Sequence, residues 1–335
     1  MRPTRTALLA VVLAALVLTL GLAACGEKSE DLSGGERTSL TLTLDFYPNP
    51  DHAGIYMAEK LGYFDAAGLD LSIETPSDPA APTKLVAAGR SDLAISYEPE
   101  VLLAHEGGLD VVAIGALVDR PLTSMIWLAK SGIGGIGDLR GKTIATAGIP
   151  YQDAYLKTIL ARANLAPGDV NTVNVGFGLL PAVLGGKADA MLGGFRNVEG
   201  VDLRLRGKGP VVTPVDQLGV PTYDELVLLA NRESLEEDPE PYRLFLAALS
   251  RGTAAAVKSP AASVDALLEA NSGLDPKLTR AEVDATLPLL SADGRMDSAA
   301  WGDFIAWMRE NELIGSEPAA SQVLSNDYLP GMIPE

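Results

Sequence analysis

The sequence predicts an α/β protein of two similarly built lobes, and three observations lead to this expectation. Residues 39–75 read as strand, loop, helix and strand, an order that predicts parallel strands joined by crossover helices. Residues 86–95 (VAAGRSDLAI) and 183–192 (VLGGKADAML) repeat one pattern of Val, Gly, a basic residue and Asp at an offset of 97 positions. Residues 222–231 (TYDELVLLAN) predict a strand that returns to the first lobe. We therefore expect lobe 1 to comprise residues 39–128 and 225–335, and lobe 2 residues 129–224.

The first lobe justifies this expectation element by element. Residues 39–47 alternate polar and apolar side chains, which is the period of a half-buried strand. Residues 52–68 have apolar residues at helical spacing and end at Gly68, and residues 69–75 alternate again. The next unit predicts a helix that ends at Gly89, a strand over residues 92–97, and a helix that begins near Pro99.

The amino-terminal residues predict a secretory signal. Arg2 and Arg5 precede an apolar run over residues 7–22, and the sequence Leu-Ala-Ala-Cys that ends at Cys25 resembles a lipobox. The alternative is a transmembrane anchor, but the run is shorter than the ~20 residues that a span prefers. We expect a signal peptide over residues 1–25, lipid attached to Cys25, and a polar flexible tether over residues 26–38. Cys25 is the only cysteine, so the chain can form no internal disulfide.

Charge and composition exclude several classes of function. The net charge of −18 is opposite in sign to what phosphate binding needs, so we expect no nucleic-acid partner. The two histidines, His52 and His105, lack the spacing of metal ligands, and the sequence has no Gly-x-Ser-x-Gly nucleophile motif. Gly132, Gly134 and Gly137 match G-x-G-x-x-G, but they lead into a strand and not into a helix. We therefore predict no metal, no cofactor and no catalytic residues.

Recognition chemistry is concentrated in loops that follow predicted strands. Only 5% of the residues are aromatic, yet the loops at residues 45–52, 96–100, 148–153 and 195–199 each contain a ring. Ligands bind at the carboxyl ends of strands in open α/β sheets. Rings, carboxylates and amides together suit a flat, nitrogen-rich heterocycle, because rings stack on its faces and acceptors take its N–H groups.

Each candidate side chain also has a purely structural interpretation. Phe46 and Tyr47 could be core residues at a strand end, Asn49 or Asp51 could cap a helix, Glu98 could be a first-turn acid, and Tyr151 could pack over the next helix. Glu199 lies in a glycine-flanked loop in which we expect no helix to cap, so its site interpretation is the most favoured.

Several segments resemble the ThiY-like solute-binding proteins of ABC transporters, whose superfamily includes the fungal thiamine pyrimidine synthases. The resemblance is carried by residues 45–64, 84–104, 148–160, 173–200 and 219–228. It implies a type II periplasmic-binding-protein fold with a ligand cleft between the two lobes. It also implies capture of N-formyl-4-amino-5-aminomethyl-2-methylpyrimidine outside the cell membrane, for import by an ABC permease and salvage.

Carried onto this chain residue by residue, the family's pocket implies Phe46, Asn49, His52, Tyr97, Glu98, Tyr151, Asn197 and Glu199 as ligand contacts. The synthases carry a lysine and a histidine in the stretch that matches residues 95–100, where this chain has Ser96 and Glu100. They also carry cysteines near the stretch that matches residues 222–227, so synthesis of the pyrimidine is disfavoured here. Arg196 departs from the aromatic residue expected after Phe195. The alternatives are another ligand such as riboflavin or an organosulfonate, a pyrimidine synthase, and a structural lipoprotein.

Overall fold

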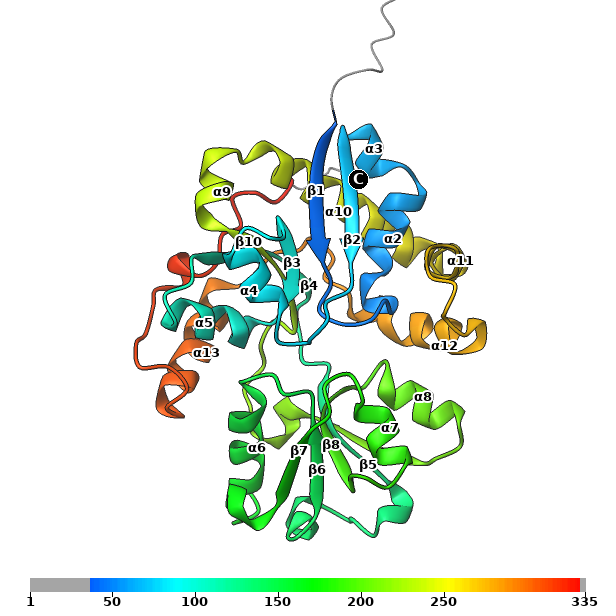
Figure 1. Ribbon diagram of the computed structural model, residues 1–335, viewed down its shortest axis with the longest axis vertical. Helices are drawn as coiled ribbons and strands as arrows, with labels where there is room; N and C mark the ends of the chain where they lie inside the picture. Colours follow the sequence, from blue (N-terminus) through cyan, green and yellow to red (C-terminus); the bar gives the residue numbers. More distant parts are fainter. Residues whose placement is uncertain (1–36, 332–335) are drawn as a thin grey trace, which may run out of the picture. The chain divides into compact units, whose positions relative to one another are not determined.

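The computed structural model describes residues 37–331 (Figure 1). The predicted signal peptide, Cys25 and nearly all of the predicted tether lie outside the described residues. Thr38, the last residue of the predicted tether, is already the first residue of a strand. Within residues 37–331, no helix combines the length and apolarity needed to cross a bilayer.

The first sheet has five strands in the order β2-β1-β3-β10-β4. The strands β1 (Thr38–Thr43), β2 (Leu69–Glu74) and β3 (Leu93–Ser96) are parallel, as predicted. The strand β10 (Leu226–Asn231) runs antiparallel between β3 and β4 (Val111–Val118). The predicted return of the chain to the first sheet is confirmed, but the sheet is mixed and not wholly parallel, because β10 enters it from the opposite end.

The second sheet repeats this arrangement in the order β7-β6-β8-β5-β9. The strand β6 (Thr143–Thr146) pairs in parallel with β7 (Asn171–Asn174) and β8 (Ala190–Phe195), while β5 (Thr123–Leu128) runs antiparallel between β8 and β9 (Pro210–Pro214). The predicted lobe 1 ran to residue 128, whereas β5 pairs only within the second sheet. The reason is that β4 and β5 are both wholly buried and mainly apolar strands, and only the short segment at residues 119–122 marks the crossing between them.

The repeat at residues 86–95 and 183–192 has the same structure in both sheets. Gly89 and Gly186 follow the helices α4 (Pro82–Ala87) and α7 (Leu179–Leu184) with positive φ values of 63° and 72°. The Asp92 carboxylate then accepts the Thr41 backbone N–H at 2.7 Å, and Asp189 accepts that of Thr143 at 2.9 Å. Each aspartate therefore ties its strand to the neighbouring parallel strand, which explains why the pattern recurs.

Helices cover both faces of each sheet (Figure 1). One face of the first sheet carries α2 (Ala53–Lys60), α3 (Tyr63–Ala66), α10 (Glu240–Lys258), α11 (Pro260–Ala270) and α12 (Pro276–Thr286), and the other carries α4, α5 (Glu98–Glu106) and α13 (Ser298–Glu310). The single helix predicted over residues 52–68 is wrong, because Gly62 takes a left-handed conformation with φ of 67° and separates α2 from α3.

The second sheet has α6 (Gln152–Ala161) on one side and α7 and α8 (Glu199–Leu205) on the other (Figure 1). The helix α9 (Arg232–Glu237) follows β10. Short 3-10 turns complete the described chain: η1 (Pro50–His52), η2 (Ala129–Ser131), η3 (Ile136–Leu139), η4 (Pro167–Asp169), η5 (Val215–Leu218), η6 (Leu287–Leu289) and η7 (Ala320–Gln322). The glycine-rich stretch at residues 132–137 leads through η3 into β6, so it opens no helix.

Glu225 joins the two places where the chain passes between the sheets. Its fully buried carboxylate accepts the backbone N–H groups of Leu122 and Thr123 at 2.7 Å each, on the outgoing crossing. It also accepts the Thr123 hydroxyl at 2.7 Å and the Tyr223 hydroxyl at 2.9 Å. Burial raises the pKa of Glu225, and these donors act in the opposite direction. One side chain therefore holds both crossings together.

Candidate functional site

A pocket lies at the carboxyl ends of strands from both sheets, as the loop positions predicted. It brings together five of the eight predicted contacts, which are Phe46, Asn49, Tyr97, Tyr151 and Glu199. Six further residues complete the lining: Ala147, Ile149, Gln152, Gly193, Phe195 and Val198. Phe46 follows β1, Tyr97 follows β3 and Ala147 follows β6, so the parallel strands of each sheet position the lining.

The loop at residues 45–52 is held in shape by its own asparagine. The Asn49 Oδ1 atom accepts the Asp51 N–H at 2.8 Å and caps η1, while Asn49 Nδ2 donates to the Tyr47 carbonyl at 3.0 Å. Asn49 therefore acts as a cap, but of η1 and not of α2, whose N-cap residue His52 makes no side-chain cap hydrogen bond. Because Asn49 also lines the pocket, its capping role places it at the rim of the site.

His52 is fully buried behind the pocket and does not line it. Its Nδ1 accepts the Asn49 N–H at 3.3 Å, which leaves the proton on Nε2, and Nε2 lies 2.8 Å from Asp45 Oδ1. The other oxygen of Asp45 accepts the Tyr97 hydroxyl at 3.1 Å. His52 therefore orients Asp45, and Asp45 orients the Tyr97 ring that faces the pocket.

Aromatic rings form two groups around the pocket. The Tyr97 and Tyr151 rings meet edge to face with centroids 5.6 Å apart. Burial raises the pKa of both phenols well above the usual value, so both remain protonated at neutral pH. In the second group, the ring of the lining residue Phe46 lies 4.7 Å from the ring of Phe177, which is in the loop between β7 and α7. The sequence reasoning missed Phe177, because its short loop carries no polar residue to mark a site.

Glu199 lies at the start of a helix, which corrects the sequence interpretation. We expected a loop with no helix to cap, but Glu199 is the first residue of α8 and its Oε2 accepts the Phe195 N–H at 2.7 Å. Acids are favoured in the first turn of a helix. The flanking glycines obscured the start of α8 in the sequence. Burial raises the pKa of Glu199 to about 7, although the hydrogen bonds from backbone N–H groups act to lower it. The carboxyl therefore changes its charge near neutral pH while facing the pocket.

Gln152 is a lining residue that the sequence reasoning did not select. Its Oε1 accepts the Ala147 N–H at 2.9 Å, which anchors the amide at the end of β6. A Cβ atom on Gly193 would approach Gln152 Nε2 to 2.3 Å, and Gly193 has a φ of 107°. Glycine at this position of β8 therefore allows the carboxamide to lie against the strand. The Gly193–Gly194 pair inside a strand was the available signal.

Glu98, Asn197 and Arg196 lie away from this lining. Glu98 is buried in the first turn of α5, as its structural interpretation proposed, and its Oε2 accepts the Asp224 N–H at 2.7 Å. Asn197 donates to two protein oxygens outside the pocket. Arg196 lines a separate groove together with Arg204. The contacts of Glu98 and Asn197 with a ligand stay predictions, and Arg196 does not replace a pocket ring.

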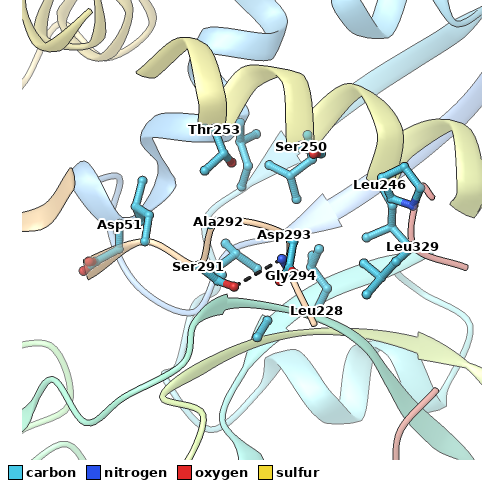
Figure 2. Close-up of a pocket in the computed structure, with 18 residues that line it drawn as sticks. Asp51, Leu228, Leu246, Ser250, Thr253, Ser291, Ala292, Asp293, Gly294 and Leu329 are labelled. Atoms are coloured by element: carbon cyan, nitrogen blue, oxygen red, sulfur yellow. Dashed lines mark hydrogen bonds between the residues drawn. The ribbon is translucent and has the colours of Figure 1, made fainter. Parts of the chain in front are cut away.

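The structure also describes a second pocket between α10, β4 and β10 (Figure 2). Its lining is mainly apolar, with Leu246 and Leu329 at one end, and the Gly294 N–H donates to Ser291 Oγ at 3.1 Å. None of the eight predicted contacts lines it. Across residues 37–331, no cluster of three or more His, Cys, Asp or Glu side chains is arranged to hold a metal ion.

Two mixed sheets of matching strand order, with a pocket at their strand ends, define the type II periplasmic-binding-protein fold. The structure is similar to that of the alkanesulfonate-binding protein SsuA from Xanthomonas axonopodis pv. citri bound to MOPS, with a TM-score of 0.70. The match covers 87% of this chain and 99% of that chain at 16% sequence identity, so it shows the fold alone.

The chain belongs to the NMT1/THI5-like family, whose model matches residues 49–263. It is 35% identical over 280 residues to a "Putative thiamine biosynthesis protein" of Haemophilus influenzae, covering 83% of this chain and 88% of the relative. It is 32% identical over 324 residues to the "Formylaminopyrimidine-binding protein" of Halalkalibacterium halodurans, covering 94% and 98%.

The same family contains enzymes. The chain is 27% identical over 297 residues to the 4-amino-5-hydroxymethyl-2-methylpyrimidine phosphate synthase of Legionella pneumophila, covering 88% of this chain and 93% of the relative. Family membership therefore fits both a binding protein and a synthase, and the side chains of the pocket must distinguish them.

Proposed function

We propose that this protein is the extracytoplasmic solute-binding component of an ABC importer and captures a thiamine-precursor pyrimidine. The ligand that fits best is N-formyl-4-amino-5-aminomethyl-2-methylpyrimidine or a close analogue. One observation carries the proposal: the pocket combines the rings of Phe46, Tyr97 and Tyr151 with the single carboxyl of Glu199. A sequence identity of 32% to a formylaminopyrimidine-binding protein along nearly the whole chain supports the same ligand class.

In this proposal Phe46 and Tyr151 flank the pyrimidine ring, since flat heterocycles stack on aromatic faces. The Glu199 carboxylate accepts hydrogen bonds from the exocyclic amine or a ring nitrogen, and Asn49 contacts a substituent at the rim. His52 acts through Asp45 and Tyr97. In this proposal the lining side chains recognise the ligand, and none of them transforms it.

The proposal includes the position of the protein in the cell. Residues 1–25 act as a signal peptide, Cys25 carries the lipid that anchors the chain to the outer face of the cell membrane, and residues 26–38 act as the tether. A permease in that membrane receives the ligand. Mass spectrometry of the protein from cultures grown with and without globomycin tests the anchor. An unmodified Cys25 in the mature protein contradicts it.

Two alternative functions fit the pocket less well. A sulfonate would place a negative charge beside the Glu199 carboxyl, which is costly in a buried site whenever that carboxyl is ionised. A pyrimidine synthase needs reactive side chains, but both ring nitrogens of His52 are occupied by Asn49 and Asp45. Ser96 is likewise engaged with Thr83 at 2.8 Å.

Thermal unfolding with a ligand panel tests the proposed function. The panel contains the formylated aminopyrimidine, riboflavin and an alkanesulfonate, each added to the chain that begins at residue 26. Because a ligand that binds only the folded state stabilises it by mass action, the aminopyrimidine should raise Tm and the other two should not. A shift with riboflavin or sulfonate alone would assign a different ligand. No shift with any member would favour a structural lipoprotein.

A further inference from the structure

Asn197 forms a bridge between the two sheet systems at a place outside the ligand pocket. It follows β8 of the second sheet, and its Nδ2 donates at 2.8 Å to Asp51 Oδ1 in η1 and at 2.8 Å to Thr286 Oγ1 at the end of α12. Both partners belong to the part of the chain that packs on the first sheet. All three side chains are buried, with exposed fractions of 2%, 1% and 0%. The contact therefore lies in a buried part of the molecule, although Asp51 also lines the second pocket (Figure 2).

Two oxygens in this bridge have no hydrogen-bond partner. They are Asp51 Oδ2 and Asn197 Oδ1, the second atoms of the two groups that are already joined. An ionised Asp51 carboxylate can only accept hydrogen bonds. It therefore leaves Asp51 Oδ2 and Asn197 Oδ1 without a donor in a buried site. A protonated Asp51 has one O–H group, which can donate the hydrogen bond that the Asn197 carbonyl oxygen does not receive from any other group. A carboxyl and a carboxamide can then pair side by side through two hydrogen bonds.

The charged groups that face Asp51 are all acidic or paired. Asp45 lies in the same loop, where His52 is bonded to it. The negative charges of Glu199 in α8 and of Glu225, which precedes β10, add to the rise in the Asp51 pKa. Asp51 in turn raises the pKa of Glu282 in α12. In the described part of the chain, no Lys or Arg forms an ion pair with Asp51. Burial, followed by Asp45, raises the pKa of Asp51 well above its usual value, and the Asn197 hydrogen bond lowers it.

We propose that closure of the two lobes takes up a proton at Asp51, whose carboxyl then donates to Asn197 Oδ1 while Asn197 Nδ2 donates to Asp51 Oδ1. When the lobes separate, Asp51 meets water and ionises. The linkage rests on the proposed role as a closing binding protein, because it makes ligand capture depend on pH through a residue that does not touch the ligand. Asp51 is thus a positioning residue for lobe closure.

The sign of the pH effect follows from this state of protonation. The pKa of Asp51 is higher in the folded state than in the unfolded state, where it is about 3.9. Its contribution to stability is therefore complete below the unfolded pKa and is lost as pH rises toward the folded pKa. An amide in place of the carboxyl makes the same two hydrogen bonds and has no proton to lose. The variant Asp51→Asn should therefore gain stability relative to wild type as pH increases.

The first test needs no ligand and measures Tm from pH 4 to pH 8. The quantity compared is the Tm of Asp51→Asn minus the Tm of wild type. We expect this difference to be at least about 2 °C larger at pH 7 than at pH 4. The matched control is Asp284→Asn, an exposed aspartate on α12, for which the difference from wild type should stay constant. A difference for Asp51→Asn that does not change with pH overturns the proposal, even if the variant is less stable throughout.

The second test separates proton uptake from the proposed ligand. Calorimetric titration with the formylated aminopyrimidine in buffers of different ionisation enthalpy reports the number of protons exchanged on binding. Wild type should take up more protons at pH 7 than Asp51→Asn does, by up to one. Equal uptake by the two proteins contradicts the linkage. Absence of binding by both proteins contradicts the proposed function, while the Tm comparison still decides the protonation of Asp51.

Discussion

At the scale of single residues, Asp45 holds the first-sheet side of the pocket in place. It accepts hydrogen bonds from the buried His52 ring and from the Tyr97 hydroxyl. The variant Asp45→Ala leaves both donors without an acceptor, and each costs about 1–3 kcal/mol. We expect the free energy of unfolding to fall by about 2–4 kcal/mol in urea titrations. Asp70→Ala, at an exposed position of β2, is the control and should remain close to wild type.

If Asp45→Ala unfolds at the same urea concentration as Asp70→Ala, the His52 and Tyr97 hydrogen bonds do not support the fold. The tyrosine arrangement would then need another explanation.

In the proposed function, Glu199 is the acceptor through which the pocket recognises the ligand. Replacement by Gln removes a charged acceptor, so affinity for the aminopyrimidine should fall by about 1.5–3 kcal/mol. Because the pKa of Glu199 is raised to about 7, the carboxylate increases in population as pH rises through that value. The ratio of wild-type to Glu199→Gln affinity should therefore increase from about pH 6 to about pH 8.

Titration calorimetry of both proteins measures this ratio, with Glu59→Gln on the exposed side of α2 as the control. Equal affinities of wild type and Glu199→Gln at every pH would remove Glu199 from the site.

At the scale of elements, α2 and α10 approach each other through glycine. A Cβ atom on Gly252 of α10 would lie 2.2 Å from the Gly54 carbonyl oxygen of α2. Gly252→Ala should therefore lower stability by about 1–3 kcal/mol through overpacking. The matched control is Gly302→Ala in α13, where the added Cβ meets nothing within 4 Å. There the better helix propensity of alanine should raise stability by about 0.5–1 kcal/mol.

Opposite signs for these two substitutions are the expected result in urea unfolding. A gain of stability in both variants would show that α2 and α10 are not in close contact at Gly252.

Local sequence signals predicted the strands and their loops but not every element boundary. The alternation in residues 39–47 and the repeated Gly-basic-x-Asp pattern identified β1, β3 and β8, because both features depend on neighbouring residues alone. The sheet to which β5 belongs depends on distant pairing, so two adjacent apolar strands gave no indication of it. Gly62 ended α2 early because a left-handed residue interrupts a pattern that otherwise continues.

The same distinction applies to the site. Phe46, Asn49, Tyr97, Tyr151 and Glu199 follow predicted strand ends, and the family resemblance selected them from the residues of those loops. Gln152 and Phe177 are brought to the site by tertiary packing, through the Ala147 backbone and the Phe46 ring. His52 was selected through the family resemblance, but its hydrogen bonds with Asn49 and Asp45 place it behind the lining. Sequence alone has no information about such bonds.

At the scale of the whole molecule, two sheet systems share one pocket and are joined by two crossings. Glu225 holds the crossings together, and the Asn197 bridge joins the two sheet systems at a separate place. Lobe closure around a small ligand is the motion that this arrangement favours. The proton at Asp51 would tune that motion without altering the ligand contacts.

The most direct test of the central claim is a calorimetric titration of the chain beginning at residue 26 with N-formyl-4-amino-5-aminomethyl-2-methylpyrimidine. We predict saturable binding of one ligand per chain, weakened by Glu199→Gln. A protein that gives no saturable heat with this compound or with any other aminopyrimidine would contradict the account.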